Sequence, residues 1–478
     1  MELVTLIPHR LSYGPAGSAA SDQARLAFDD ITAPEFRQGL YEVCHYPRSA
    51  LRGCVGPLAI DQTLWFSHEL NERLNDEGKL IVVEYRNEDR QNVAVVVGAY
   101  LMLGLGWSAR EVCGTLPKDA GLTFPCSWIE PGDLRTARGK PLMTVQDCWE
   151  GVQMARDLGW LRKETVNDGI MASLAASQFW KTNCEYDAAW LVPGAVVVMA
   201  DPMTTIKDPN PKTCPAFGDG KLQGSDDNWE TGSLDDLRRQ SVCDSSPSRP
   251  SSPNVAFHEK VSDFVPGTTP STTDGRDSDE FQKGQRDSAS VLTVCKVYGS
   301  GDALARGCDL WPGARPFVDF LLEEGIKIVV RVNMSDEPGS YDAGLLADVG
   351  IQHADVPVSD SKHPSNKGGV PPPAAIKRFF TLTRHMAAED GGAVLVHCKG
   401  GFGRSVFLAC LFVIHKYNVS GRGLLGWARI ARPGALTTPE QESVLRSLSG
   451  RVDLCRRYGI PCEGPADTPA AKGCCTVS

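Results

Sequence analysis

Short apolar runs alternate with longer stretches of helical periodicity along both halves of the chain. The runs at residues 80–83, 326–330 and 393–396 are rich in β-branched residues, which is typical of strands buried on both faces of a parallel sheet. Helical patterns lie between them, so the pattern predicts an α/β fold whose parallel or mixed sheets are flanked by helices. The longest apolar run, residues 93–107, contains three glycines and is too short for comfortable membrane crossing, so it predicts a buried core helix.

One plan of strand, polar turn and apolar helix occurs twice, at residues 80–112 and 394–424. This faint repeat supports two similar lobes, although a chance likeness between two α/β segments explains it equally well. The first turn contains no cysteine, whereas the second contains Cys398. Only the second turn is therefore equipped for chemistry.

Composition divides the chain further. Residues 208–290 are crowded with Ser, Thr, Pro, Gly, Asp and Arg and have few clustered aliphatic residues, which predicts a disordered insert. We therefore expect a first, non-catalytic lobe at residues 1–185, a second lobe at 186–455 that the insert interrupts, and a tail at 456–478.

Charge and cysteine usage exclude several classes of protein. The chain has 478 residues with a net charge of −10, which argues against a nucleic-acid partner or affinity for bare anionic lipid. The first residues lack a basic start followed by an apolar stretch, so we expect no secretory signal and a cytoplasmic or nuclear protein. The sixteen cysteines are then expected to be reduced, and the lack of Cys-x-x-Cys pairs argues against a disulfide framework or a zinc site.

The candidate chemistry lies in the second turn. Cys398 and Arg404 are six positions apart and can close around one phosphoryl group if the residues between them bend so that their N–H groups point inward. Glycines make this bend cheap, and the helix that begins near Gly403 directs its positive end at the same spot. Such a cradle favours a nucleophilic thiolate at Cys398, and Arg404 can bind two phosphate oxygens. The predicted phosphate-binding residues, besides Arg404, are Lys399, Gly400, Gly401, Phe402 and Gly403.

The neighbours of the turn take supporting roles in this interpretation. Ser405 is placed to hydrogen-bond the sulfur, and His397 is expected to brace the loop. The Cys–Arg spacing alone is weak evidence, because Cys243 and Arg249 have the same separation. That pair has no strand before it and no glycine between its members, so we expect no function for it.

The loop at residues 397–405, HCKGGFGRS, resembles the signature of cysteine-dependent protein tyrosine and dual-specificity phosphatases. Residues 426–434 (GWARIARPG), 439–441 (PEQ) and 190–194 (WLVPG) are similar to the cell-division-cycle-fourteen class of these enzymes. Residues 56–58 (GPL) and 92–100 (NVAVVVGAY) are similar to the first lobe of that class, which has lost its cysteine. The resemblance implies two tandem phosphatase-like lobes, of which only the second is catalytic.

The resemblance also implies an acid and a mechanism. The class uses an aspartic acid on a mobile loop, and Asp360 matches its spacing, with Asp355 and His363 as local competitors and a turn-capping role for Asp360 as the alternative. In the implied first step Cys398 attacks phosphorus while Asp360 protonates the leaving group. Water then releases the phosphate, with Gln441 positioning that water unless its side chain is merely solvated. No metal or other cofactor is required.

The implied substrates are phosphoproteins with Ser-Pro sites followed by a basic residue two positions further on, in cell-cycle, cytoskeletal or ciliary control. Residues 246–249, SPSR, fit this pattern, so we hypothesise that Ser246 is a phosphosite that the enzyme itself clears, the alternative being a spacer with incidental Ser-Pro pairs. Two rival functions remain open. A phosphoinositide phosphatase would use the same loop, although more lysines than Lys399 would be expected there, and a scaffold would bind phosphoproteins without turnover.

The last four residues form a C-a-a-X pattern. It suggests farnesylation of Cys475, with Cys474 available for a second acyl chain, and hence peripheral membrane contact. One prenyl chain binds membranes marginally, so stable anchoring would need both cysteines. A chance occurrence of four residues is an equal alternative.

Overall fold

A computed structural model provides the structure of the protein. It describes residues 3–18, 24–27, 57–76, 80–85, 89–124, 142–169, 171, 175, 182–183, 186–202, 314–334, 337, 341–361, 363–366, 368–387 and 392–462. The predicted insert at 208–290 and the modification candidates Ser246, Cys474 and Cys475 lie outside these residues, as do Cys243 and Arg249.

The first lobe, described residues 3–169, is built on a four-stranded mixed sheet of order β1-β2-β4-β3. Strand β2 pairs antiparallel with β1 and parallel with β4, and β3 pairs parallel with β4. The elements of this lobe are β1 (Val4–Ile7), β2 (Leu11–Pro15), β3 (Ala24–Ala27), α2 (Ile60–Asp76), β4 (Ile81–Tyr85), α3 (Arg90–Leu103), α4 (Ala109–Thr115), α5 (Pro117–Ala120), β5 (Thr123–Phe124), β6 (Met143–Thr144), α6 (Val145–Asp157) and α7 (Glu164–Asn167).

The second lobe, described residues 186–462, contains a five-stranded mixed sheet of order β10-β9-β11-β8-β7. Its strands are parallel except β7, which pairs antiparallel with β8. The elements are β7 (Ala188–Val192), β8 (Val196–Met199), α13 (Ala314–Glu323), β9 (Ile326–Arg331), α14 (Gly344–Ala347), β10 (Gln352–Asp355), η3 (Pro364–Asn366), α15 (Pro373–Thr383), η4 (Arg384–Ala387), β11 (Ala393–His397), α16 (Arg404–Tyr417), α17 (Gly421–Ala431), α18 (Pro439–Arg446) and α19 (Arg451–Tyr458).

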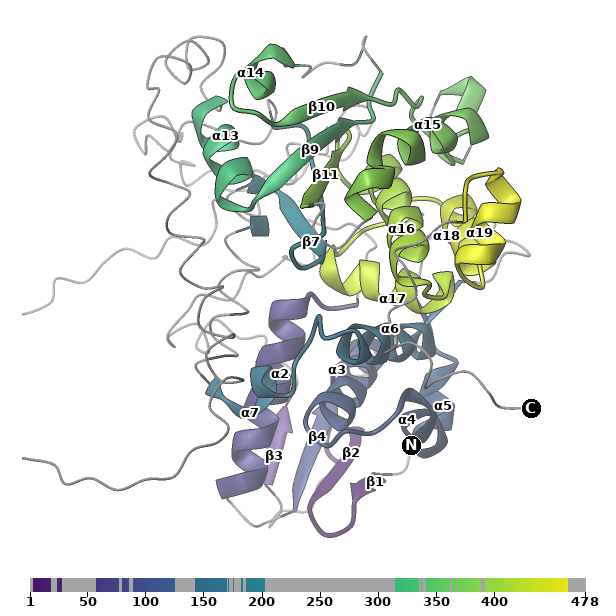
Figure 1. The fold of residues 1–478 in the computed structure, drawn as a ribbon. Helices are drawn as coiled ribbons and strands as arrows, with labels where there is room; N and C mark the ends of the chain where they lie inside the picture. Colours follow the sequence, from purple (N-terminus) through teal and green to yellow (C-terminus); the bar gives the residue numbers. More distant parts are fainter. Residues whose placement is uncertain are drawn as a thin grey trace, which may run out of the picture.

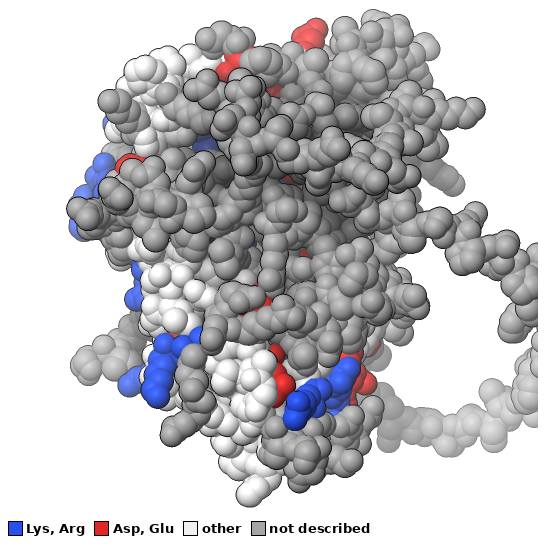
Figure 2. Space-filling view, turned by 180° about the vertical axis from the view of Figure 1, so that it is seen from behind, with Lys and Arg blue, Asp and Glu red and all other residues white. Residues whose placement is uncertain are grey.

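The predicted α/β class is confirmed. Strands β4, β9 and β11 coincide with the three apolar runs, and the run at 93–107 supplies most of α3, which is buried from Asn92 to Leu103. No described helix is long and apolar enough to span a membrane. Figure 2 shows both basic and acidic side chains on the described part of one face, together with uncharged surface.

Alternation along the strands explains why the second sheet is covered on both faces. Leu395 of β11 packs with the helices α13 and α14, whereas its neighbours Val394 and Val396 belong to the core on the opposite face. Successive side chains of a strand point to opposite faces, so a strand with apolar residues at every position must be buried twice. In Figure 1, α13 and α14 lie on one side of this sheet and α15 and α16 on the other.

The two lobes meet where α17 lies along α6 (Figure 1). Glycines allow the two backbones to approach closely. A Cβ atom on Gly426 would lie 2.1 Å from the carbonyl oxygen of Asp147, and one on Gly151 would lie 2.5 Å from the amide nitrogen of Trp427. The Trp427 indole N–H donates to the carbonyl of Leu191 at 2.7 Å, which ties α17 to β7 as well. The lobes therefore share one continuous core across this contact.

The close approach predicts opposite outcomes for two glycines of α17. Gly426→Ala forces a methyl group against the backbone of α6, so we expect it to lower the free energy of unfolding by about 1–3 kcal/mol. At Gly423 a Cβ would meet its nearest atom at 3.4 Å, an ordinary contact. Gly423→Ala should then be neutral or stabilise the helix by up to about 1 kcal/mol. Denaturant unfolding measures both variants, and equal effects would contradict this account of the contact.

Candidate active site

The candidate site forms where three parallel strands end side by side. Asp201 and Asn333 follow the carboxyl ends of β8 and β9, and Cys398 follows β11, which lies between those two strands. The Asn333 amide donates to the buried Asp201 carboxylate at 3.2 Å. Carboxyl ends of neighbouring parallel strands meet at one edge of a sheet, which is where open α/β sheets bind ligands. Cys398 therefore lies at the edge of the sheet where the polar residues Asp201 and Asn333 also lie.

Three carbonyl groups of residues 398–403 accept hydrogen bonds from other parts of the second lobe. The carbonyl of Lys399 accepts from the amide of Asp201 at 3.0 Å, and the carbonyl of Phe402 accepts from the amide of Leu436 at 2.8 Å. Arg432 donates from Nε to the carbonyl of Gly401 at 3.3 Å. In a trans peptide the N–H points opposite to its carbonyl, so the amides of residues 400, 402 and 403 point away from these partners. A phosphate cradle requires amides on this side of the turn, and the cradle itself stays a prediction.

Two residues, one within the turn and one outside it, fix its conformation. Gly401 has φ +67°, and a Cβ there would lie 2.5 Å from the backbone of Met199, so glycine is required on both counts. Arg432 is 2% exposed, stacks its guanidinium 4.3 Å from the Phe402 ring centroid and pairs with Asp187 at 2.6 Å. Sequence reasoning missed Arg432 as a support of the loop. The sequence feature that could have pointed to Arg432 is its position in the segment GWARIARPG, residues 426–434.

The Cys398 sulfur lies inside the cradle. Its side chain is 3% exposed, the Gly401 amide donates to Sγ at 3.2 Å, and Ser405 Oγ lies 3.3 Å from Sγ. The Gly401 amide therefore donates to the sulfur, whereas in the contact between Ser405 and Cys398 either atom can be the donor. The role of Ser405 as a donor to the sulfur stays a prediction. Lys399, by contrast, is exposed.

Arg404 is held by a carboxylate that the sequence analysis did not single out. Its Nη1 and Nη2 both bond to the carboxylate of Glu337, the latter at 2.7 Å, and Nη1 also donates to the carbonyl of Val358 at 2.8 Å. Burial by itself lowers the pKa of Arg404, but the hydrogen bond to Glu337, together with the charges of Cys398, Glu337 and Asp360, raises the pKa above its ordinary value. Glu337 lies several residues after β9. The sequence feature that could have pointed to it is a carboxylate just beyond the end of a parallel strand.

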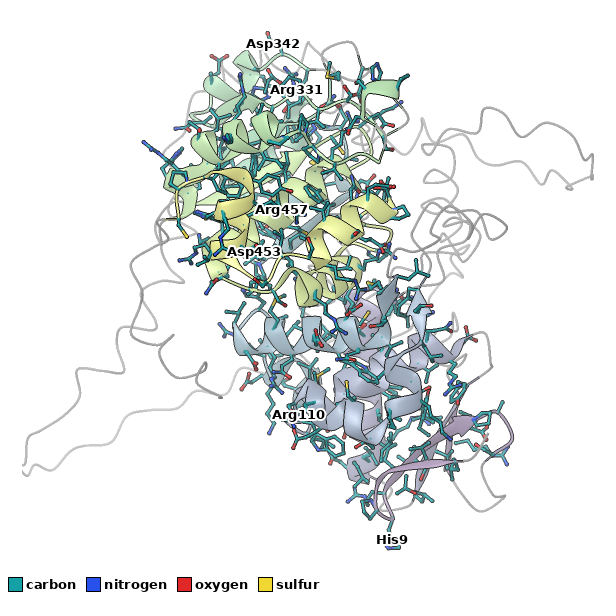
Figure 3. All side chains as sticks on the ribbon, turned by 90° about the vertical axis from the view of Figure 1, so that its right-hand side faces the viewer. His9, Arg110, Arg331, Asp342, Asp453 and Arg457 are labelled. Atoms are coloured by element: carbon teal, nitrogen blue, oxygen red, sulfur yellow. The ribbon has the colours of Figure 1, made fainter. Side chains whose placement is uncertain are left out.

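The three acid candidates lie in different environments. Asp360 is 51% exposed on its side chain and brings Oδ2 within 3.6 Å of Arg404 Nη2. Asp355 instead pairs with Arg331 at 2.6 Å, and Arg331 lies near the outer end of the second lobe in Figure 3. Burial by itself raises the pKa of Asp355, but the Arg331 partner lowers it below its ordinary value. His363 bonds to Ser365 at 2.7 Å on the surface. Among these three, Asp360 is the residue whose described contacts reach the cradle.

Gln441 is buried, with 1% exposure, so the reading of a merely solvated side chain is wrong. Its amide is bonded at both ends: Nε2 donates to the carbonyl of Gly369 at 2.7 Å, and Oε1 accepts from the amide of Thr437 at 3.0 Å. The residue therefore connects α18 to the segment that follows Asp360.

His397 lies beneath the loop and is fully buried. Its Nε2 lies 2.9 Å from the Tyr341 hydroxyl, a contact that the sequence did not predict. Burial, with smaller effects from His353 and Arg331, lowers the pKa of His397 to about 3. The imidazole is therefore neutral at physiological pH. In the described part of the chain no group of three or more His, Cys, Asp or Glu side chains is arranged to hold a metal ion.

Comparisons with known proteins agree with the site. A family model described as "Polymorphic toxin system, DSP-PTPase phosphatase" matches residues 312–417. The tyrosine-protein phosphatase CDC14 homolog of Schizosaccharomyces pombe is 31% identical over 124 residues, covering 26% of this chain and 21% of that protein. The dual specificity protein phosphatase CDC14C of Homo sapiens is 29% identical over 126 residues, covering 26% of this chain and 25% of that protein.

This chain is similar to CDC14 dual-specificity phosphatases. The resemblance inferred from the motifs is thereby confirmed, while the matched region spans only between a fifth and a quarter of the length of these curated relatives. Among solved structures, the active form of Tk-PTP is 25% identical and covers 26% of this chain and 79% of its own, with a TM-score of 0.22.

The buried neutral His397 predicts a pH dependence of stability. Its folded pKa, about 3, lies below the ordinary value of 6.5, so the unfolded chain binds the extra proton between these values. Stability is therefore retained above pH 6.5 and falls on acidification toward pH 3, by up to about 1.4 kcal/mol per pH unit. Denaturant unfolding of wild type and His397→Asn between pH 7 and 5 measures this. The variant should have the shallower slope, and equal slopes would contradict a buried neutral imidazole.

Proposed function

We propose that this chain is a cysteine-dependent dual-specificity protein phosphatase that works through a phosphocysteine intermediate. The observation that carries the proposal is the cradle, in which the Gly401 amide and the Ser405 hydroxyl both lie against the Cys398 sulfur, with Arg404 at the other end of the turn. The similarity of residues 312–417 to a phosphatase family supports the same chemistry.

The proposed reaction has two balanced steps. The Cys398 thiolate attacks phosphorus in line, the S–P bond forms, and the P–O bond to the substrate breaks while Asp360 gives its proton to the leaving oxygen. A water molecule then attacks phosphorus, the S–P bond breaks, and Asp360 takes the proton of the water. Inward amides and Arg404 stabilise charge on the transferring oxygens in both steps. Ser405 donates to the sulfur as the thiolate leaves.

The finer assignments belong to the same proposal. We propose a preference for phosphoserine followed by proline with a later basic residue, in reversal of proline-directed kinases that act in cell-cycle, cytoskeletal or ciliary control. Ser246 as a self-cleared phosphosite, and lipidation of Cys475 and Cys474, stay predictions from the sequence. We do not assign Gln441 to positioning water, because both ends of its amide already have protein partners.

The nucleophile is tested by removing the sulfur. Cys398→Ser should abolish turnover of phosphopeptides and aryl phosphates alike, while its thermal unfolding stays close to wild type because oxygen fills nearly the same space. Acid quenching of wild type during turnover of a phosphopeptide labelled with radioactive phosphate should trap phosphate on Cys398. Turnover by the serine variant would rule out the phosphocysteine route.

The acid is tested by leaving groups. Asp360→Asn should slow hydrolysis of a phosphoserine peptide by about 10²-fold or more, because an alkoxide leaves poorly without a proton. An aryl phosphate with an acidic phenol needs little such help and should be affected far less. Asp355→Asn serves as the matched control and should keep both activities, since that carboxylate pairs with Arg331. The reverse pattern would assign the acid to Asp355.

Substrate class is tested with a panel. Phosphopeptides that vary Ser, Thr and Tyr, the following proline and the later basic residue should give the highest kcat/KM for Ser-Pro with the basic residue. Vesicles that contain phosphoinositides form the second arm of the panel. Faster release of phosphate from these lipids than from every peptide would replace the protein substrate with a lipid one, and binding without release would indicate a scaffold.

A further inference from the structure

Hydrogen bonds from Arg446 join the C-terminal end of helix α18 to the first lobe. Arg446 donates from Nη2 to Asp147 Oδ2 at 2.5 Å and to the carbonyl of Leu142 at 2.6 Å, and both acceptors belong to the first lobe. Asp147 has no exposed surface, also pairs with Arg422 and caps its own helix by accepting from the amide of Thr144 at 2.7 Å. The carboxylate is therefore fixed by α6 and presents a rigid anchor to α18.

The N-terminal end of α18 is fastened to the chain that follows Asp360. Thr438 Oγ1 donates to the carbonyl of Gly368 at 2.5 Å, beside the bond from Gln441 to Gly369 at 2.7 Å. Both glycines have positive φ, and a Cβ on Gly368 would lie 2.4 Å from Glu440 Cγ. We call the described residues 356–361, 363–366 and 368–369 the acid segment. Its opposite end is held by the bond from Arg404 to the carbonyl of Val358.

The helix between these two sets of hydrogen bonds is short, and a buried ion pair holds it in its middle. It has eight residues, and its Glu442 forms an ion pair with Arg429 of α17 in which both side chains are 1% exposed. Arg446 near one end of α18 and Thr438 and Gln441 near the other therefore belong to one short helical element. Because Asp360 must reach the leaving oxygen to within a hydrogen bond, small displacements of its segment reduce proton donation steeply.

We propose that the first lobe positions the general acid: Arg446, held by Asp147, sets α18, and α18 holds the acid segment through Thr438 and Gln441. Arg446 and Gln441 are positioning residues in this scheme. The inference rests on the proposed function, because it assigns a role in the step in which Asp360 donates its proton. It gives the first lobe, which lacks the loop of residues 397–405, a part in catalysis.

The test uses Arg446→Met, which keeps an apolar stem but removes the bonds to the first lobe. Arg457→Met is the matched control. Arg457 lies on α19 (Figure 3), and it donates to the Ser447 hydroxyl at 2.6 Å, just beyond the same end of α18. We expect Arg446→Met to lower kcat/KM for a phosphoserine peptide by about 10-fold and that for an acidic-phenol aryl phosphate by less than about 2-fold. The control should change both values by less than about 2-fold.

A double-mutant cycle separates positioning from general damage. In an Asp360→Asn background the effect of Arg446→Met on the phosphoserine peptide should disappear, because the group that it positions is gone. An equal loss on both substrates, or a full effect in the Asp360→Asn background, would overturn the inference. Asp147→Asn, which retains a capping oxygen, should give the same signature as Arg446→Met, and it replaces that variant if thermal unfolding finds Arg446→Met unfolded.

The proposed function and this inference fail in different ways. If the wild-type chain hydrolyses neither substrate, the proposed function is wrong. If wild type hydrolyses both and the leaving-group dependence of Arg446→Met and Asp147→Asn equals that of wild type, only the positioning role is wrong.

Discussion

The candidate site depends on one constraint, the outward orientation of three carbonyl groups in residues 398–403. Each carbonyl has a partner from a different part of the second lobe, namely Asp201 after β8, Arg432 at the end of α17 and Leu436 before α18. Removing any of these partners would free a peptide to rotate and turn its N–H away from the anion. The segments after β8, at the end of α17 and before α18 thus hold these three peptides in one orientation.

Much of the fold and part of the site could be predicted from the sequence. Strands buried on both faces leave long apolar runs, and those at β4, β9 and β11 were read directly from the chain. The loop was predictable because its chemistry is local: the nucleophile, the glycines and Arg404 lie within seven consecutive residues. Its required positive φ at Gly401 also agrees with the residue type.

The missed residues share a physical reason. Glu337, Tyr341 and Arg432 act through contacts with residues 31 to 67 positions away, which no local pattern encodes. The alternative of a solvated Gln441 could not be excluded from the sequence, because the burial of this residue depends on the approach of residues 368–369, which are far away in sequence. Asp355 and Asp360 are the same residue type, and in the structure their partners separate them: Asp355 pairs with Arg331, whereas Asp360 lies near Arg404.

The bonds of Arg404 have a further consequence for substrate affinity. A free arginine side chain samples many rotamers, and ordering it costs up to about 2 kcal/mol of conformational entropy. Here Glu337 and the Val358 carbonyl have already restricted the guanidinium within the folded chain. The entropy of arranging this side chain is lost once, during folding, and is not lost again each time a phosphorylated ligand arrives.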